Sequence, residues 1–168
     1  MKAGIQTFKT PFGDLFVVST FTDQPMVIGA GFGRKSDLLS RISHDRSELE
    51  ISKNSNSNSI STAVSDWLDG DLSAFDLLVT EQIGSSFRQQ CWKAMRKIPP
   101  AKTISYAQLA SKTKSPNAVR AAATACAQNL IAPIIPCHRI VRSDGSLGRY
   151  GYGELTKHKL LEFEKRFL

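Results

Sequence analysis

Residues 105–128 read SYAQLASKTKSPNAVRAAATACAQ and carry the clearest local-structure signals in the chain. Ser105 followed by Gln108 has the spacing of a capping box, in which the two side chains satisfy the first backbone donors of a helix. We therefore predict a helix from about Tyr106 to Lys112, followed by a short polar turn.

A second helix is predicted after that turn, from about Pro116 to Gln128. Ser115 precedes Pro116, so a capping serine is followed by a proline at the first helical position. The helix is rich in alanine and has one charged residue, Arg120, so it is thin enough to approach either a neighbouring helix or the floor of a DNA groove. The two predicted helices form a helix-turn-helix pattern, whose second helix usually lies in a groove of DNA. With few long polar side chains, it would read little base sequence.

Further helices flank this pair. Ser86 and Gln89 have capping-box spacing, and the helix they start would end at Pro99-Pro100. Its apolar face would hold Phe87, Cys91, Met95 and Ile98. A final helix begins at about Thr156. Residues 85–168 are therefore predicted to form a mostly helical domain.

Residues 1–84 show a different pattern, which predicts a small α/β domain. Strands are expected at residues 5–8, 15–20 and 26–30. One helix is expected at residues 36–42, and a second has the apolar stripe Ile60, Ala63, Val64, Trp67 and Leu68, closed by Gly70. Residues 52–59, SKNSNSNS, are polar and of low complexity, and we expect them to form an exposed, mobile loop.

Charge is unevenly divided between these two halves. Residues 1–84 contain 7 Lys and Arg and 11 Asp and Glu, a net charge of −4, whereas residues 85–168 contain 15 and 4, a net charge of +11. A basic half is the expected electrostatic footprint of a nucleic-acid surface. A solvated basic face that aids solubility would have the same composition.

Several classes of protein are disfavoured by composition. No apolar stretch approaches the ~20 residues that span a bilayer, and the first residues lack the apolar core of a secretory signal. We therefore expect a cytoplasmic protein, or a nuclear one if the source is eukaryotic, without membrane contact. The three cysteines are odd in number and lack Cys-x-x-Cys spacing, which argues against disulfides and a structural zinc site.

Pro136-Cys137-His138-Arg139 places a thiol, an imidazole and a guanidinium side by side. A free thiol has a pKa of about 8.5, and a nearby imidazole or guanidinium lowers it and produces the nucleophilic thiolate. The motif therefore indicates a reactive Cys137. The alternative is a small buried cysteine at the end of a strand.

Glu164 is predicted to point inward from the final helix. It shares one helical stripe with Lys157, Leu160, Leu161 and Leu168. A buried carboxylate is tolerated when it is paired, and His138 is the obvious partner. A salt bridge to Lys157, or exposure at the helix end, is the alternative.

The motifs of residues 84–168 closely resemble those of the O6-alkylguanine-DNA alkyltransferases. They are, in order, Ser105-Tyr106-Ala107-Gln108-Leu109-Ala110, Asn129, Pro136-Cys137-His138-Arg139, Gly145 and Gly148-Arg149-Tyr150-Gly151. The resemblance implies a ribonuclease-H-like α/β domain followed by a mostly helical domain with a winged-helix-like helix-turn-helix. It also implies direct DNA repair, in which Cys137 irreversibly accepts the alkyl group of O6-alkylguanine, once per molecule.

The resemblance also implies roles for individual residues. Glu164, His138, a water molecule and Cys137 would form the relay that makes the thiolate. Arg120 would enter the base stack in place of a nucleotide extruded through the minor groove, and Tyr106 would help rotate its phosphate. Extrusion is required because the O6 substituent lies inside the duplex.

Asn129 would brace the turn that bears the cysteine, although an asparagine at a helix end is often a left-handed cap. The residues implied to contact DNA are Ser105, Tyr106, Arg120, Ala121 and Arg139, of which Arg139 could instead pair inside the fold. Those implied to line the substrate pocket are Ile135, Pro136, Tyr150, Gly151, Tyr152 and Lys157.

The implied partner is double-stranded DNA containing O6-alkylguanine, bound by a monomer without cofactor or metal. Activity on O4-alkylthymine and cooperativity on DNA stay open. Two other classes of protein compete with this assignment. A helix-turn-helix transcription factor would not explain Cys137 and Glu164, and a cysteine hydrolase would not explain the helix pair. A non-enzymatic alkyltransferase-like protein would have tryptophan where Cys137 stands.

Overall fold

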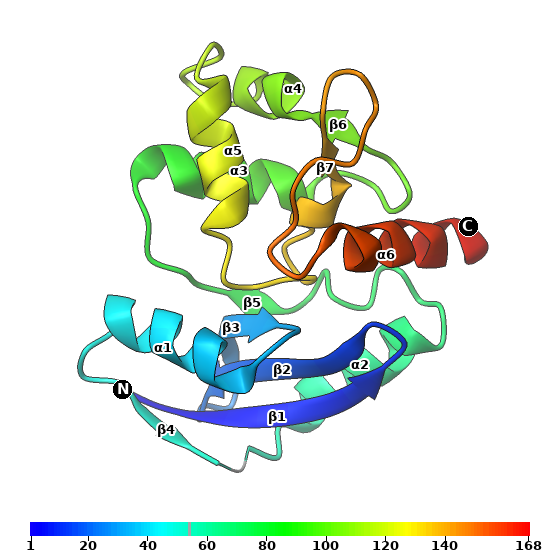
Figure 1. The fold of residues 1–168 in the computed structure, drawn as a ribbon. Coiled ribbons are helices and arrows are strands. Elements are labelled where there is room, and N and C mark those ends of the chain that lie inside the picture. Colours follow the sequence, from blue (N-terminus) through cyan, green and yellow to red (C-terminus); the bar gives the residue numbers. More distant parts are fainter. Residues whose placement is uncertain (54) are drawn as a thin grey trace. The chain divides into compact units, whose positions relative to one another are not determined.

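The computed structural model describes residues 1–53 and 55–168. The chain forms two compact units, drawn as ribbons in Figure 1. Unit 1 contains Met1–Ile83 and Leu130–Ala132, and unit 2 contains Gly84–Asn129 and Pro133–Leu168. The chain therefore leaves unit 2 after Asn129 and returns to it at Pro133, an excursion that the sequence motifs did not predict.

Unit 1 is built on a five-stranded sheet with the order β4-β1-β2-β3-β5. Its strands are β1 (Lys2–Thr10), β2 (Gly13–Thr20), β3 (Met26–Gly31), β4 (Glu50–Ser52) and β5 (Val79–Thr80). The first three pair antiparallel, whereas β4 and β5 are parallel to their neighbours. The three strands predicted from alternation and turn residues are confirmed, and the short edge strands were missed.

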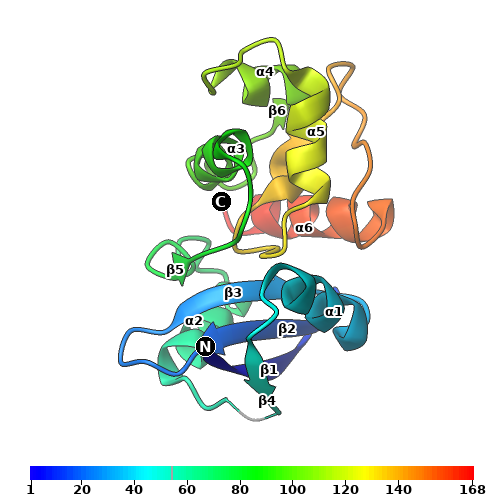
Figure 2. The same ribbon diagram turned by 90° about the vertical axis from the view of Figure 1, so that its left-hand side faces the viewer.

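Two helices lie on opposite sides of this sheet, α1 (Lys35–Asp45) in front of the strands in Figure 1 and α2 (Asn58–Leu68) behind them, and the two are to the right and to the left in Figure 2. Gly29 lies in β3 where a Cβ atom would collide with Ile42 of α1, so α1 packs directly on the strand backbone. In α2 the predicted stripe is buried at Ile60, Ala63, Val64 and Trp67. Both predicted helices are confirmed.

The segment over residues 52–59 agrees only partly with the predicted exposed loop. Five of its described residues are exposed, namely Ser52, Lys53, Asn56, Asn58 and Ser59. Ser52 ends β4, and Asn58 and Ser59 begin α2, while residue 54 lies outside the described part. Ser55 is buried, with its backbone N–H donating to the carbonyl of Ile5. A short polar side chain can be buried when the backbone finds such a partner, which a composition argument does not detect.

Unit 2 contains α3 (Ser86–Arg96), α4 (Tyr106–Ser111), α5 (Val119–Ala127), α6 (Glu154–Arg166) and the 3₁₀ turn η1 (Cys137–Arg139). Strands β6 (Ile104–Ser105) and β7 (Ile140–Val141) pair in parallel. Helices α3 and α5 lie side by side (Figure 2), and Trp92 Nε1 donates to the carbonyl of Ala125 at 2.9 Å. The predicted mixed α/β class, with a sheet first and helices after it, is confirmed.

The helix starts in unit 2 agree only partly with the predicted caps. The capping box of Ser105 and Gln108 is present at α4. At α3 the cap is Ser85 rather than Ser86, since its side chain accepts from the backbone N–H of Arg88. Helix α5 begins at Val119, because Ser115 and Pro116 form a turn closed by the N–H of Ala118 instead of a helical cap.

No helix in the described part of the chain is long and apolar enough to cross a membrane.

Candidate active site around Cys137

Cys137 is positioned by a short segment with little freedom. The turn η1 is closed by the backbone N–H of Cys137 on the carbonyl of Ile135, at 2.9 Å, and by the N–H of Arg139 on the carbonyl of Pro136, at 3.0 Å. Directly afterwards, Ile140 and Val141 enter β7 and pair with β6. The thiol is therefore carried by a turn whose backbone hydrogen bonds are satisfied on both sides.

Asn129 holds the cysteine from the other side. Its side-chain nitrogen donates to the carbonyl of Ile135 at 2.9 Å and to Sγ of Cys137 at 3.2 Å. A hydrogen bond donated to sulfur favours the thiolate over the thiol. Asn129 is buried and does not have a positive φ angle, so the left-handed cap is wrong and the bracing role fits the contacts.

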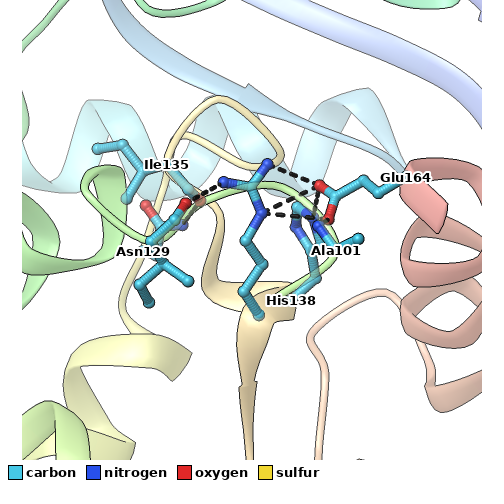
Figure 3. Close-up of polar contacts among 7 residues, drawn as sticks. Ala101, Asn129, Ile135, His138 and Glu164 are labelled. Carbon is cyan, nitrogen blue, oxygen red and sulfur yellow. Dashed lines mark hydrogen bonds and ion pairs between the residues drawn. The ribbon is translucent and has the colours of Figure 1, made fainter. Parts of the chain in front are cut away.

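Glu164 is buried on α6 and accepts hydrogen bonds from three directions. His138 Nε2 lies 2.7 Å from Oε1, and the guanidinium of Arg139 donates to both carboxylate oxygens at 2.7–3.2 Å. The backbone N–H of Ala101 donates to Oε2 at 2.9 Å. Figure 3 shows Ala101, His138 and Glu164 joined around this carboxylate. The inward orientation predicted from the helical stripe is confirmed, although Leu168 of that stripe is exposed.

Burial and hydrogen bonding together set the protonation states of Glu164 and His138. Burial raises the pKa of the Glu164 carboxyl, but hydrogen bonds and charge from His138 and Arg139 outweigh it and bring the pKa to about 2. Burial lowers the pKa of the His138 imidazole, an effect that outweighs the attraction of Glu164. The stable arrangement is therefore an ionised Glu164 beside a neutral His138.

A neutral His138 has a defined tautomer in this site. Because Nε2 faces a carboxylate, it carries the proton and donates it to Glu164, which leaves Nδ1 as an acceptor. Nδ1 is buried and has no hydrogen-bond partner among the residues that the structure describes. The imidazole can therefore take up one proton at Nδ1, and Glu164 would stabilise the cation that results.

The guanidinium of Arg139 is hydrogen-bonded to groups inside the fold. Besides its bonds to Glu164, its Nη1 donates to the carbonyl of Ile98 at 2.6 Å. Of the two predicted alternatives, the contacts show internal pairing, and a contact of Arg139 with DNA stays a prediction. One carboxylate serves both residues of the motif, because neighbouring positions in η1 face the same buried end of α6.

Lys157 is fully buried and supports the loop before α6. Its Nζ donates to the carbonyl of Ile140 at 2.6 Å and to that of Arg149 at 3.4 Å, and lies 5.9 Å from the ring centroid of Tyr106. Burial lowers the pKa of its ammonium group. Lys157 thus ties β7 to the loop and does not pair with Glu164.

A cavity of about 530 Å³ opens beside Cys137. Of the residues predicted for the substrate pocket, Tyr150 and Gly151 line it, whereas Ile135, Pro136, Tyr152 and Lys157 are not among its lining residues. Tyr106, predicted to act on the phosphate of the extruded nucleotide, lines it as well. Arg142 and Arg149 also line it and were missed. Sequence motifs do not distinguish these two arginines from other basic residues, because the loop geometry decides which of them turn toward the cavity.

Burial also determines the chemistry of the other two cysteines. Burial raises the pKa of Cys91 to about 11 and raises that of Cys126 well above its usual value. Both are therefore weak nucleophiles at neutral pH. No group of His, Cys, Asp or Glu in the described part of the chain has the arrangement of a metal site.

The face of α5 that points to solvent is made of small side chains. Arg120, Ala121, Ala123 and Ala127 are exposed, whereas Ala122 and Ala125 are buried against the domain. Ser105 and Tyr106 are half-buried at the start of α4. Burial also raises the pKa of the Tyr106 phenol. The helix pair thus presents a thin surface with one long cationic side chain.

Together, the fold and the site define a protein in which a cysteine next to a buried His–Glu pair shares one unit with two helices joined by a short turn. The family description "6-O-methylguanine DNA methyltransferase, DNA binding domain" matches residues 86–166. The methylated-DNA–protein-cysteine methyltransferase of Salmonella typhimurium is 31% identical, over 92% of this chain and 91% of its own. The chain belongs to this family of methyltransferases.

Two further similarities agree with this assignment. The bifunctional transcriptional activator and DNA repair enzyme Ada of Escherichia coli is 53% identical over 48% of this chain, but the match spans only 23% of Ada. The crystal structure of Mycobacterium tuberculosis OGT in complex with DNA superimposes with a TM-score of 0.78 and 28% identity, covering 99% of this chain and 94% of that one.

Proposed function

We propose that this protein repairs double-stranded DNA by moving the alkyl group of O6-alkylguanine irreversibly onto Cys137. The observation that carries the proposal is the environment of this sulfur. Cys137 accepts a hydrogen bond from Asn129, lines a cavity and precedes the imidazole paired with Glu164. Cys91 and Cys126 have raised pKa values and lack that combination.

The proposed reaction begins with loss of the thiol proton. Cys137 gives its proton to Nδ1 of His138 through a water molecule, and Glu164 stabilises the imidazolium. The thiolate attacks the alkyl carbon, so a carbon–sulfur bond forms while the bond between that carbon and O6 breaks. The departing guanine leaves as an anion and takes up one proton, which balances the proton removed from the thiol. The thioether product is stable, so each molecule acts once.

The base must leave the duplex before the sulfur can reach it. We propose that the exposed alanine face of α5 approaches the minor groove, that Arg120 fills the gap in the base stack, and that Tyr106 rotates the phosphate. A cavity of about 530 Å³ lies within the range of small-molecule sites and would hold the extruded base. Unit 2 would thus carry both DNA binding and alkyl transfer.

The Tyr150 hydroxyl supports binding of a polar base in this cavity. It is buried and has no hydrogen-bond partner among the described residues, while its ring stacks edge-on against Tyr152 at 5.5 Å between centroids. A buried hydroxyl without a partner is costly, and the edge of a guanine could satisfy it.

Intact-protein mass spectrometry tests the proposal. After mixing with a duplex containing O6-methylguanine, the protein should gain one methyl group stoichiometrically and without cofactor, and peptide mapping should locate it on Cys137. Cys126→Ala is the matched control, because Cys126 lines the same cavity. This variant keeps Cys137 and should still react. Methylation of Cys91 or Cys126, or repair by Cys137→Ala, would overturn the assignment.

A further inference from the structure

A second concavity in unit 2, of about 550 Å³, shares no lining residue with the cavity at Cys137. It lies between α3, the chain from residue 97 to residue 104, and the end of α4. Four lysines line it, Lys93, Lys97, Lys102 and Lys112, and Ala94 and Ile98 contribute to its apolar part. We call it the lysine groove.

The charges of the lysine groove have no internal counter-charge. The four lysines are exposed, and their ammonium groups form no hydrogen bond or ion pair within the described part of the chain. No Asp or Glu occurs anywhere between Glu81 and Asp144. Lys93 on α3 and Lys97, which caps the end of that helix, also stand four residues apart, a spacing at which like charges repel. An anionic partner would relieve this repulsion.

Helix α4 connects the lysine groove with the reactive site. Tyr106, its first residue, lines the cavity at Cys137, and Lys112, which caps its other end, lines the lysine groove. A six-residue helix is about 9 Å long. Duplex DNA carries one phosphate charge per about 1.7 Å of its axis, so a duplex bound at the cavity continues well beyond that distance.

We propose that the lysine groove binds backbone phosphates of the duplex at a distance from the damaged base, which rests on the proposed function in that DNA is the partner. Such contacts carry no base information and hold the protein on undamaged DNA. Lysine suits this role, because it acts as a point charge on a flexible stem.

Salt-dependent binding of the full-length protein to an undamaged duplex of about two helical turns tests the lysine groove. Each phosphate contact contributes about 0.9 to the slope of log K against log salt, which corresponds to about fivefold in Kd near 0.15 M salt. Lys93→Gln, Lys97→Gln and Lys112→Gln should each lower the slope by that amount, and the triple variant should bind about 100-fold more weakly. Lys159→Gln, an exposed lysine of α6 outside the groove, is the matched control.

Transfer from free O6-benzylguanine should be unchanged in all these variants, because the free base has no backbone. A slope equal to that of the unaltered protein, or an equal loss in Lys159→Gln, would overturn the proposal. So would variants that keep the DNA slope but lose binding to polyglutamate, since the groove would then receive an acidic protein. Failure of the proposed function is seen separately, as absence of methyl transfer to Cys137.

Discussion

Removing the charge of Glu164 should change how the stability of unit 2 depends on pH. The carboxyl has a pKa of about 2 in the folded protein against 4.5 in an unfolded chain. Because the folded value is the lower one, the ionised group stabilises the fold above pH 4.5, and this contribution is lost as the pH falls toward 2. Between pH 5 and pH 3 the loss is about 2 kcal/mol. Glu164→Gln lacks this titration.

At pH 7 the variant should also be less stable, by about 3–5 kcal/mol, because Arg139 loses its buried partner. The stability difference between the two proteins should therefore shrink by about 2 kcal/mol between pH 5 and pH 3. His138 stays in both proteins. Since burial lowers its pKa below 6.5, the unfolded chain binds that proton first, and both proteins lose stability as the pH falls below 6.5.

Urea denaturation followed by tryptophan fluorescence measures this difference. A Trp67→Phe background leaves Trp92, which is buried in α3, as the reporter of unit 2. Glu162→Gln is the matched control, since this exposed residue lies on the same helix and pairs with Lys165 at the surface, so the change should have little effect. A stability difference between Glu164→Gln and the parent that stays constant from pH 5 to pH 3 would refute the reasoning.

Three further changes separate chemistry, base extrusion and backbone strain. His138→Ala should slow single-turnover methyl transfer about 100-fold at pH 7 and shift the pH at which the transfer rate rises to a higher value, with DNA affinity unchanged. An unshifted pH–rate profile of the folded variant would remove the histidine from the mechanism. Arg120→Ala should slow transfer from a duplex by about tenfold or more and leave transfer from free O6-benzylguanine nearly unchanged. Arg166→Ala is the control. Equal losses on both substrates would assign Arg120 to folding. Ala101 has a φ of 59°, in the left-handed region. Because a left-handed alanine costs more than the added freedom of glycine in the unfolded chain, Ala101→Gly should raise the free energy of unfolding, measured in urea, by about 0.5–1 kcal/mol. A less stable variant would contradict this.

The residues whose partners are close in sequence were the predictable ones. The capping box of Ser105 and Gln108 forms because both groups belong to one helical turn, and the inward position of Glu164 follows from its spacing along a single helix. Ser115-Pro116 has an equally good local pattern, yet a turn uses it and α5 starts at Val119. A proline preset for the first turn of a helix is also preset for a β-turn, so local sequence does not distinguish the two.

Among the partners that depend on tertiary placement, the pairing of His138 with Glu164 was predicted and is confirmed, but the rest of that cluster was not. Arg139 and His138 share Glu164, and the backbone of Ala101 completes that cluster, but nothing in the spacing of residues 101, 139 and 164 indicates that they meet. Lys157 illustrates the same limit, because its ammonium group is directed to backbone carbonyls of residues 140 and 149. Backbone acceptors carry no residue-specific signature in a sequence.

The excursion of Leu130–Ala132 into unit 1 affects how this protein can be divided. The backbone of Ala30 in β3 donates to the carbonyl of Leu130 at 2.7 Å and accepts from the N–H of Ala132 at 3.0 Å, and Gln82 accepts from the N–H of Leu130 at 2.8 Å. Residues 130–132 stand in the sequence between Asn129 and Cys137, whose side chains are joined by the hydrogen bond to Sγ. A fragment cut at residue 84 would retain every side chain proposed to act in catalysis and still leave this strand-like segment without its hydrogen-bond partners. The boundary at which the sequence changes character is therefore a poor site for splitting the protein, and a split reporter or a transplanted reactive half should carry the first 83 residues along, in cis or as a separately supplied chain.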